Sequence, residues 1–277
     1  MSSYVIISDG LGNQMFQYAF MLALRAKGIP VKGDISLFKR AKMHNGFELQ
    51  KVFGINDTFV SRSGLSLFAL RCMLSLNNHF LIQTDSAIDF NNFFRHKSLI
   101  YRGYWQDARF LCSIEDEIRK SFTFMNIDSK NVSIVKELQA RNSVSLHIRR
   151  GDYIGNQEVE AICNEAYYNK AISVICSEVS APFFYVFSND LRWAETYIKK
   201  TGVDYELVDN NQGCHSYKDM YLMTQCKHNI IANSSFSWWG AWLNANETKI
   251  VVAPKQWTRS KYKRCLQLDG WVLCDNE

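Results

Sequence analysis

Residues 144–152, Val-Ser-Leu-His-Ile-Arg-Arg-Gly-Asp, decide the fold, because a short apolar run passes directly into a charged loop that contains a glycine. Similar apolar runs follow, and helical stretches near 165–179, 191–201, 216–226 and 236–244 separate them. Short apolar strands that alternate with helices are typical of a parallel sheet covered on both faces. The second half of the chain is therefore predicted to be a doubly wound α/β domain, with strands at 144–148, 183–187, 205–208, 229–232 and 250–253.

The N-terminal end shows the same arrangement. A β-prone run at 4–7 is broken by Gly10 and Gly12, and a helix with one apolar face follows until Gly28. This is the opening of a second strand–helix unit.

A chain of 277 residues is long enough for about two domains. The polar stretch near 140 is the predicted boundary, which gives domains 1–140 and 141–277. In the first domain, residues 65–76 are expected to form a buried helix, and residues 113–120 a helix start capped by the Ser-x-x-Asp pattern.

Composition and charge limit the possible functions of the chain. The net charge of +5 permits an anionic ligand without demanding nucleic acid. The eight cysteines show no zinc spacing and are expected to be free thiols. There is no signal-peptide pattern and no apolar span of about 18 residues, so the chain is expected to be cytoplasmic. Basic residues near the C-terminus fit either a solvated surface or peripheral contact with the inner membrane; they are Lys255, Arg259, Lys261, Lys263 and Arg264.

The loop after the strand at 144–148 is the first candidate site, because ligands of parallel sheets bind beyond the carboxyl ends of the strands. Arg149 and Arg150 suit a phosphate, since guanidinium groups bind it through two parallel hydrogen bonds. Gly151 allows a close approach of the backbone, and Asp152 can orient an arginine or accept a proton. The alternatives are a solvated surface turn or a chance Arg-Gly-Asp motif.

Other loops also follow predicted strands. Asn189 comes directly after the strand at 183–187, and Ser234 and Ser235 open a helix whose N-terminus could bind an anion or simply be capped. Asp219 is either a site residue or the partner of Ser216 in a capping box. The tryptophans at 238, 239 and 242 are core residues or a sugar platform. Together these loops predict a site for a diphosphate joined to something polar.

The N-terminal loop adds Gly12, Asn13 and Gln14, which are rich in hydrogen-bonding groups. Both the dinucleotide pattern Gly-x-Gly-x-x-Gly and the Walker pattern are absent from this loop.

Three segments, residues 10–19 (GLGNQMFQYA), 147–153 (HIRRGDY) and 233–241 (NSSFSWWGA), resemble the α-1,2-fucosyltransferases of glycosyltransferase family 11. This is the inverting family of bacterial O-antigen enzymes and animal blood-group H enzymes. The second segment is also found in α-1,6- and protein O-fucosyltransferases. Asp9 departs from the family, whose members often have another glycine there, which puts the conformation of that loop in question.

The resemblance implies a GT-B fold, in which two Rossmann-like domains face each other across a cleft. It implies GDP-β-L-fucose as the donor and a galactosyl glycan, lipid-linked or free, as the acceptor. No cofactor and no divalent metal are implied, in agreement with the absence of an Asp-x-Asp motif. The missing membrane anchor favours the bacterial branch of the family.

The resemblance also assigns residues. Arg149 and Arg150 would bind the diphosphate, with His147 shaping the same pocket, and Asp152 and His147 are the nearest candidates for a general base. The residues implied to line the nucleotide site or to face the cleft are Asp219, Ser234, Ser235, Phe236, Gly12, Asn13 and Gln14. The alternatives are a noncatalytic glycan-binding module and a transferase that uses another GDP-sugar.

Overall fold

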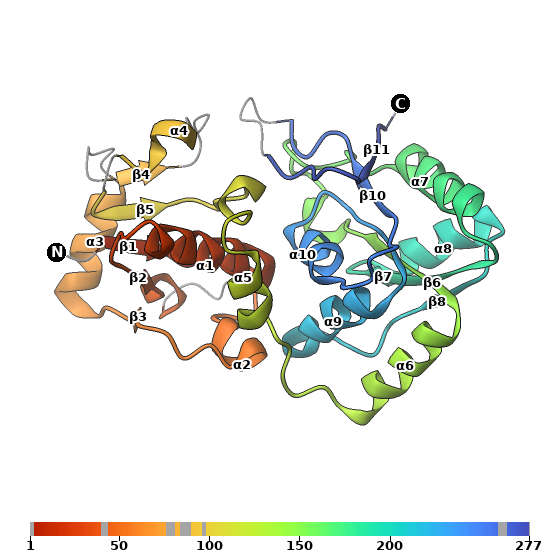
Figure 1. Ribbon diagram of the computed structural model, residues 1–277, viewed down its shortest axis with the longest axis horizontal. Helices are drawn as coiled ribbons and strands as arrows, with labels where there is room; N and C mark the ends of the chain where they lie inside the picture. The colour runs from red at the N-terminus through yellow and green to blue at the C-terminus, as the bar shows by residue number, and fades with distance from the viewer. Residues whose placement is uncertain are drawn as a thin grey trace. The chain divides into compact units, whose positions relative to one another are not determined.

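The computed structural model describes residues 3–39, 44–75, 81–83, 90–95, 98–259 and 265–276. The chain divides into two compact units, Met1–Met125 and Asn126–Glu277, drawn from red to yellow-green and from green to blue in Figure 1. The boundary thus precedes helix α6 (Ser129–Ala140), whereas the sequence placed it near residue 140. The reason is packing, since α6 buries Val135 and Leu138 against the core of the second unit.

The second unit is built on a six-stranded parallel sheet with the strand order β11-β10-β9-β6-β7-β8. All five predicted strands are confirmed with small shifts at their ends, and β11 is an additional strand that the sequence did not predict. The strands are β6 (Asn142–Ile148), β7 (Pro182–Ser188), β8 (Tyr205–Leu207), β9 (His228–Ile230), β10 (Val251–Pro254) and β11 (Val272–Cys274). The helices between them are α7 (Glu165–Glu178), α8 (Leu191–Thr201), α9 (Tyr217–Gln225) and α10 (Ser235–Leu243).

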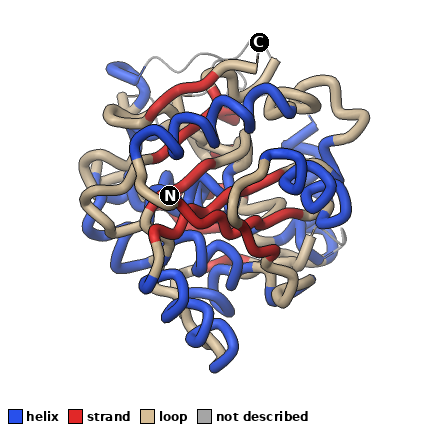
Figure 2. The backbone as a smooth tube through the Cα atoms, turned by 90° about the vertical axis from the view of Figure 1, so that its right-hand side faces the viewer, coloured by secondary structure: helices blue, strands red, loops and turns tan. Residues whose placement is uncertain are grey.

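Helices lie on either side of this sheet (Figure 2), and the side chains on both of its faces are buried. Leu146 and Ile148 of β6 pack with Ile172 of α7 and Ile198 of α8. On the other face, Tyr185 and Phe187 of β7 pack with α6 and α9. Because side chains alternate along a strand, two apolar faces explain why the strand sequences are almost continuously apolar.

The first unit has a five-stranded parallel sheet with the order β3-β2-β1-β5-β4. Its strands are β1 (Ser3–Ile6), β2 (Val31–Asp34), β3 (Phe59–Val60), β4 (Leu81–Gln83) and β5 (Ile100–Arg102). Its helices are α1 (Leu11–Ala26), α2 (Leu49–Phe53), α3 (Gly64–Ser75), α4 (Phe90–Phe93) and α5 (Glu115–Ser121). An aromatic cluster fills its core, centred on Phe20 of α1, which stacks on Trp105 with ring centroids 3.8 Å apart.

Two expectations for this unit are wrong. Helix α3 forms, but it is only partly buried, since Leu70 packs against Ile6 and Ile100 whereas Leu65 is 87% and Phe68 66% exposed. Helix α5 follows Ile114 and has no side-chain cap at its N-terminus. The acidic residues that suggested a cap lie in its first turn, where they complement the helix dipole.

The described helices include none long and apolar enough to cross a membrane. All eight cysteines are free thiols, as expected. The predicted membrane contact through the basic C-terminal residues remains a prediction, because residues 260–264 lie outside the described residues.

The hydroxyl of Tyr185 is buried in the core of the second unit without a hydrogen-bond partner. We expect Tyr185→Phe to leave the free energy of unfolding unchanged or to raise it by up to about 1 kcal/mol, because an unpaired buried hydroxyl costs desolvation energy. The control is Tyr168→Phe, which removes a hydroxyl that donates to the His147 carbonyl at 3.1 Å. Urea denaturation should show the control destabilised by about 1 kcal/mol. Equal losses in both variants would mean that the Tyr185 hydroxyl is paired.

Candidate functional site

The topology of the second sheet brings two of the three motifs together. From β6 the chain proceeds outward through β7 and β8 on one side, and from β9 outward through β10 and β11 on the other. Ligands of doubly wound sheets bind at such a switch point, beyond the carboxyl ends of the two central strands. The loop after β6 begins with Arg149, and the loop after β9 leads to Ser234. A direct hydrogen bond links the two motifs, because the Tyr153 hydroxyl donates to the Asn233 carbonyl at 3.1 Å.

The side chain of Asn189 holds the arginine loop in shape. Its Oδ1 accepts hydrogen bonds from the backbone N–H groups of Arg150 at 2.9 Å and Gly151 at 3.3 Å. Its Nδ2 donates to Asp152 at 3.0 Å. A Cβ atom on Gly151 would lie 2.8 Å from that nitrogen, so any larger residue would push the Asn189 amide out of its place. Asn189, which the sequence placed among the ligand-binding residues, therefore braces the loop.

The two arginines are anchored by different elements. Arg149 forms an ion pair with Asp152 at 2.6 Å, within its own loop, and its Nε is buried without a partner. Arg150 reaches across to the first turn of α8. There it approaches Asp190 at 3.4 Å and lies over the ring of Trp193, 4.8 Å from its centroid. The unequal anchoring means that the two guanidinium groups are directed to different places.

The far side of Trp193 is supported as well. Its ring stacks on Tyr197 with centroids 5.4 Å apart and planes at 8°. Asp190 also caps α8 by accepting from the Trp193 backbone N–H at 3.2 Å. Arg150 therefore lies on an aromatic support formed by Trp193 and Tyr197. Neither the sequence motifs nor the amino-acid composition indicates this support. The only sequence signal is that Asp190 and Trp193 follow Asn189 at the spacing of a capped helix.

His147 is almost fully buried at the end of β6, on the sheet face opposite to that of Ile148. Its ring centroid lies 5.9 Å from that of Phe236, and its Nδ1 is buried without a partner. Burial, together with the positive charge of Arg149, lowers the pKa of His147 to about 3. The imidazole is consequently neutral, and it is too weak a base to take a proton from a hydroxyl near pH 7.

Asp152 is no better suited to be a base. One of its oxygens accepts from Arg149 and the other from Asn189. A carboxylate engaged in this way orients the arginine. The low pKa of His147 and the two engaged oxygens of Asp152 argue against either residue as the general base, and the assignment of that role remains a prediction.

The serines of the third motif open α10. Ser234 is the N-cap, since its hydroxyl accepts from the Phe236 N–H at 3.3 Å, and Ser235 is the first residue of the helix. The N–H groups of this first turn can bind an anion at the switch point. The tryptophans that follow are core residues, with Trp238 and Trp239 fully buried.

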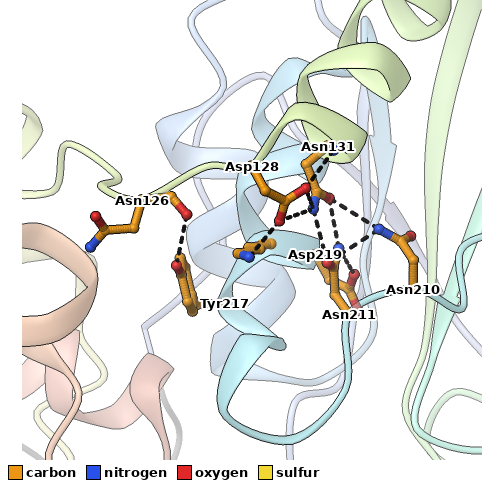
Figure 3. A network of polar contacts seen from close by, with 8 residues as sticks. Asn126, Asp128, Asn131, Asn210, Asn211, Tyr217 and Asp219 are labelled. Carbon is orange, nitrogen blue, oxygen red and sulfur yellow. Dashed lines mark hydrogen bonds and ion pairs between the residues drawn. The ribbon is translucent and has the colours of Figure 1, made fainter.

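Asp219 belongs to a separate polar network, shown in Figure 3, where α9 meets the segment that enters the second unit. Asn211 donates to Asp219 at 2.9 Å and is itself paired with Asn131. Burial raises the pKa of Asp219 to about 7. Ser216 provides no side-chain cap to α9, so the capping-box interpretation of Asp219 is wrong. Among the described residues, no hydrogen bond joins Asp219 to Arg149 or Arg150, so its predicted place in the nucleotide site remains a prediction.

The same network contains an ion pair between Lys218 and Asp128 at 2.5 Å. This pair, with a hydrogen bond from Asn131, holds the pKa of Asp128 well below its usual range. Asp128 is thus charged at every working pH, whereas Asp219 is the group of this network that titrates near neutrality.

In the first unit, the N-terminal motif is mostly structural. Both amide hydrogens of Gln14 are used, on the carbonyls of Asp9 at 2.7 Å and Gly46 at 2.8 Å, and its oxygen accepts from the Glu48 N–H. Gln14 is completely buried and its amide is fully engaged within the first unit, so its predicted place facing a ligand remains a prediction. Gly12 is buried in the first turn of α1.

Asn13 differs from its neighbours because it is partly exposed, and its Oδ1 accepts from Gln106 at 2.7 Å. Asp9 takes a positive φ of 65°, a conformation that favours glycine. This explains why a glycine suits that position. The sequence missed Gln106 and also Gln17, which donates to the Gly103 carbonyl at 3.1 Å and so joins the loops after β1 and β5.

The sequence pattern of the family described as Glycosyl transferase family 11 matches residues 3–274. The chain belongs to this family. Among its relatives, an alpha-1,2-colitosyltransferase of Escherichia coli is 35% identical, over 91% of this chain and 90% of that protein. The O-antigen biosynthesis glycosyltransferase WbnK of Escherichia coli is 34% identical, over 97% and 99%. A galactoside alpha-(1,2)-fucosyltransferase 1 of Ateles belzebuth is 28% identical, over 89% and 66%.

Among solved structures, the fucosyltransferase NodZ from Bradyrhizobium has a TM-score of 0.50 at 10% identity, and the match covers 87% of this chain and 93% of NodZ. The likeness concerns the fold. The predicted fold class, an α/β chain of the GT-B type with two Rossmann-like units, is confirmed. This family 11 chain is a glycosyltransferase.

We expect Asn189→Ala to loosen the arginine loop, because it removes three hydrogen bonds at once. Hydrogen exchange of the Arg150 and Gly151 amides should accelerate at least about tenfold, since exchange rates report local opening. Asn142→Ala is the matched control, because Asn142 lies at the start of β6, at the end opposite to the arginine loop. Its side chain donates to the Ser180 carbonyl at 2.7 Å. If both variants exchange these two amides at the wild-type rate, Asn189 does not brace the loop.

The raised pKa of Asp219 gives its contribution to stability a definite sign. A carboxyl whose pKa is higher in the folded than in the unfolded protein favours folding below about pH 4, and this contribution is lost as the pH rises through about 7. We therefore expect the stability of Asp219→Asn, relative to that of wild type, to increase when the pH is raised from 5 to 8. Calorimetric melting temperatures at the two pH values measure this difference, and a constant difference would contradict the assignment.

Proposed function

We propose that the protein is an inverting galactoside α-1,2-fucosyltransferase, which transfers L-fucose from GDP-β-L-fucose to the 2-hydroxyl of a galactosyl glycan. The observation that carries the proposal is the pair Arg149 and Arg150, held in fixed and different orientations at the switch point of the second sheet. A diphosphate leaving group needs such positive charge, whereas a neutral glycan does not. The similarity to galactoside alpha-(1,2)-fucosyltransferase 1 supports the linkage, and WbnK supports a place in O-antigen synthesis.

In the proposed reaction, the acceptor oxygen attacks the anomeric carbon from the face opposite GDP. The new C–O bond forms as the bond to the β-phosphate oxygen breaks, and the electron pair leaves with GDP. The β-linkage thereby becomes an α-linkage through a transition state with oxocarbenium character. Negative charge grows on the departing phosphate, so fixed positive groups stabilise the transition state more than the ground state.

Arg149 is suited to this role because its Nε is buried and unpaired while Asp152 holds its other end. The N–H groups at the start of α10 would bind the remaining phosphate oxygens. His147, being neutral, would contact the nucleoside beside Phe236 without adding charge.

The acceptor proton would leave late, once the new bond has largely formed. Neither His147, with its low pKa, nor Asp152, with both oxygens engaged, is suited to remove it earlier. In this scheme water takes the proton, and catalysis depends on leaving-group stabilisation.

A second candidate is the transfer of another deoxysugar from its GDP derivative. The similarity to an alpha-1,2-colitosyltransferase favours this alternative. A noncatalytic glycan-binding module is the third, and it would bind glycan with no effect of GDP. Incubation with GDP-L-fucose or GDP-L-colitose and a panel of β1,3- and β1,4-linked galactosyl disaccharides, followed by linkage analysis of the products, separates all three.

We expect Arg149→Ala to lower the transfer rate by about 10²–10³-fold, by comparison with the loss of one oxyanion-hole donor. Arg149 holds no secondary structure together, so the melting temperature should stay near that of wild type. The control is Arg192→Ala in the first turn of α8, which removes an equal charge outside the loop. Wild-type turnover by the Arg149 variant would refute its assignment as the diphosphate group.

A further inference from the structure

Helix α3 of the first unit, drawn in orange in Figure 1, presents apolar side chains to solvent. Its inner side is packed, because Leu70 contacts Ile6 and Ile100. Leu65 and Phe68 are three positions apart, so they share the other side of the helix, where they are 87% and 66% exposed. With the exposed Ala69 they form the outer face of α3. Large apolar side chains gathered on one exposed face indicate a binding surface.

The start of α3 is held in a fixed position by Arg62, which precedes the helix. The guanidinium of Arg62 forms an ion pair with the buried Asp34 at 2.7 Å and lies over the Tyr4 ring, 4.5 Å from its centroid. The backbone N–H of Arg62 donates to the Ser36 hydroxyl at 2.7 Å. The outer face is therefore preorganised, and a partner can bind it without first ordering the helix.

The charge of the chain is divided unequally between the two units. Residues 1–125, which include α3, contain 15 Lys and Arg against 10 Asp and Glu, a net charge of +5. Residues 126–277 contain 17 of each and are neutral. The whole net charge of the chain therefore belongs to the unit that carries the outer face. Such an asymmetry between two halves of a chain is typical of proteins that bind an anionic surface with one of them.

The sequence that surrounds the outer face carries positive charge only. Residues 58–84 contain no acidic residue, whereas Arg62 and Arg71 lie in this stretch. Lys39 adds a third cation from another segment, because its Nζ donates to the Ser61 carbonyl at 3.3 Å, just before α3. Apolar side chains with basic neighbours suit an anionic bilayer, since the apolar groups enter the boundary of headgroups and acyl chains while the cations attract the lipid charge.

A second copy of the chain suits this face less well. Two first units would each bring a charge of +5 to the contact, and like charges repel. A stable protein interface also buries about 800 Å² on each partner. The three side chains of the outer face, Leu65, Phe68 and Ala69, provide only a small part of such an area. A bilayer supplies the opposite charge and needs no complementary shape.

We propose that the outer face of α3 binds the surface of an anionic phospholipid bilayer, with Leu65 and Phe68 inserted at the level of the headgroups. The positive charge of the first unit strengthens this binding. The surface is distinct from the basic C-terminal residues, which belong to the second unit. The inference goes beyond the proposed function and does not depend on which sugar is transferred. Binding of this kind brings the enzyme to glycan acceptors that are anchored in the same bilayer.

Flotation of the full chain with lipid vesicles tests the proposal. Vesicles of phosphatidylethanolamine and phosphatidylglycerol should bind the protein, and vesicles of phosphatidylcholine alone should bind it at least about tenfold more weakly, because they lack the attracting charge. Raising the salt concentration from about 0.05 M to about 0.5 M should weaken the binding to anionic vesicles, since salt screens exposed charges. Wild-type protein that does not float with the anionic vesicles overturns the proposal.

Two variants test the residues. Leu65→Ser combined with Phe68→Ser should weaken binding to anionic vesicles at least about tenfold, because the apolar contact is lost. Its control is Val132→Ser, since Val132 is 42% exposed on α6, a helix of the neutral unit. Lys39→Gln should weaken binding about fivefold, the effect of one basic residue near an anionic surface. Its control is Lys130→Gln, also on α6. Lys39 is exposed and lies outside α3, so this second test does not depend on the folding of the double variant.

Binding of the double variant and of Lys39→Gln at the wild-type level contradicts the assignment of the surface. Sedimentation equilibrium without lipid separates the other occupant, because a wild-type dimer that the double variant cannot form would make a second copy the partner and overturn the proposal. Transfer to a free galactosyl disaccharide should be equal in wild type and in the double variant. Protein that binds the vesicles as expected but forms no fucosylated product with any galactosyl acceptor contradicts the proposed function alone.

Discussion

One side-chain amide, that of Asn189, holds the ends of two neighbouring strands together. It accepts from two backbone N–H groups after β6 and donates to Asp152, which in turn holds Arg149. The approach is so close that a Cβ atom on residue 151 would displace this amide. The loop backbone, Asp152 and through it Arg149 therefore take their positions from the end of β7, whereas the Arg150 side chain is held by the first turn of α8. Preorganisation of this kind means that the positive charge needs little rearrangement when a leaving group develops negative charge.

The sequence predicted much of the second unit because the physics there is local and regular. A strand buried on both faces must be apolar, and five such runs were visible. Strand β11 was missed because Val272 and Leu273 are exposed and follow a polar stretch, so nothing in their pattern separates them from a loop. Helix α3 was judged buried because its residues are apolar, but apolarity alone does not show what covers a helix.

The site was predictable as far as residue type and strand position determine it. Arg149, Arg150 and Ser234 follow strand ends that the topology places side by side. The roles of Asn189 and Gln14 were not predictable, since an amide that binds a ligand and an amide that braces a loop look alike in sequence. Asp219 was visible as a candidate, but Asn211, which donates to it, is held by Asn131, a residue 80 positions away in the chain. Such contacts are fixed only by the tertiary fold.

Asn233 also has a consequence for the design of altered enzymes. Its carbonyl accepts from Tyr153, and its side-chain amide donates to the carbonyls of Val159 and Trp257. Two segments, residues 153–165 and the segment that contains Trp257, are thus attached to one residue. If the loop that contains Tyr153 and Val159 were transplanted alone from a relative that transfers a different sugar, it would lose these attachments. The exchangeable module consists of residues 153–165, 233 and 257 together, and recombination inside it would separate parts that function only as one.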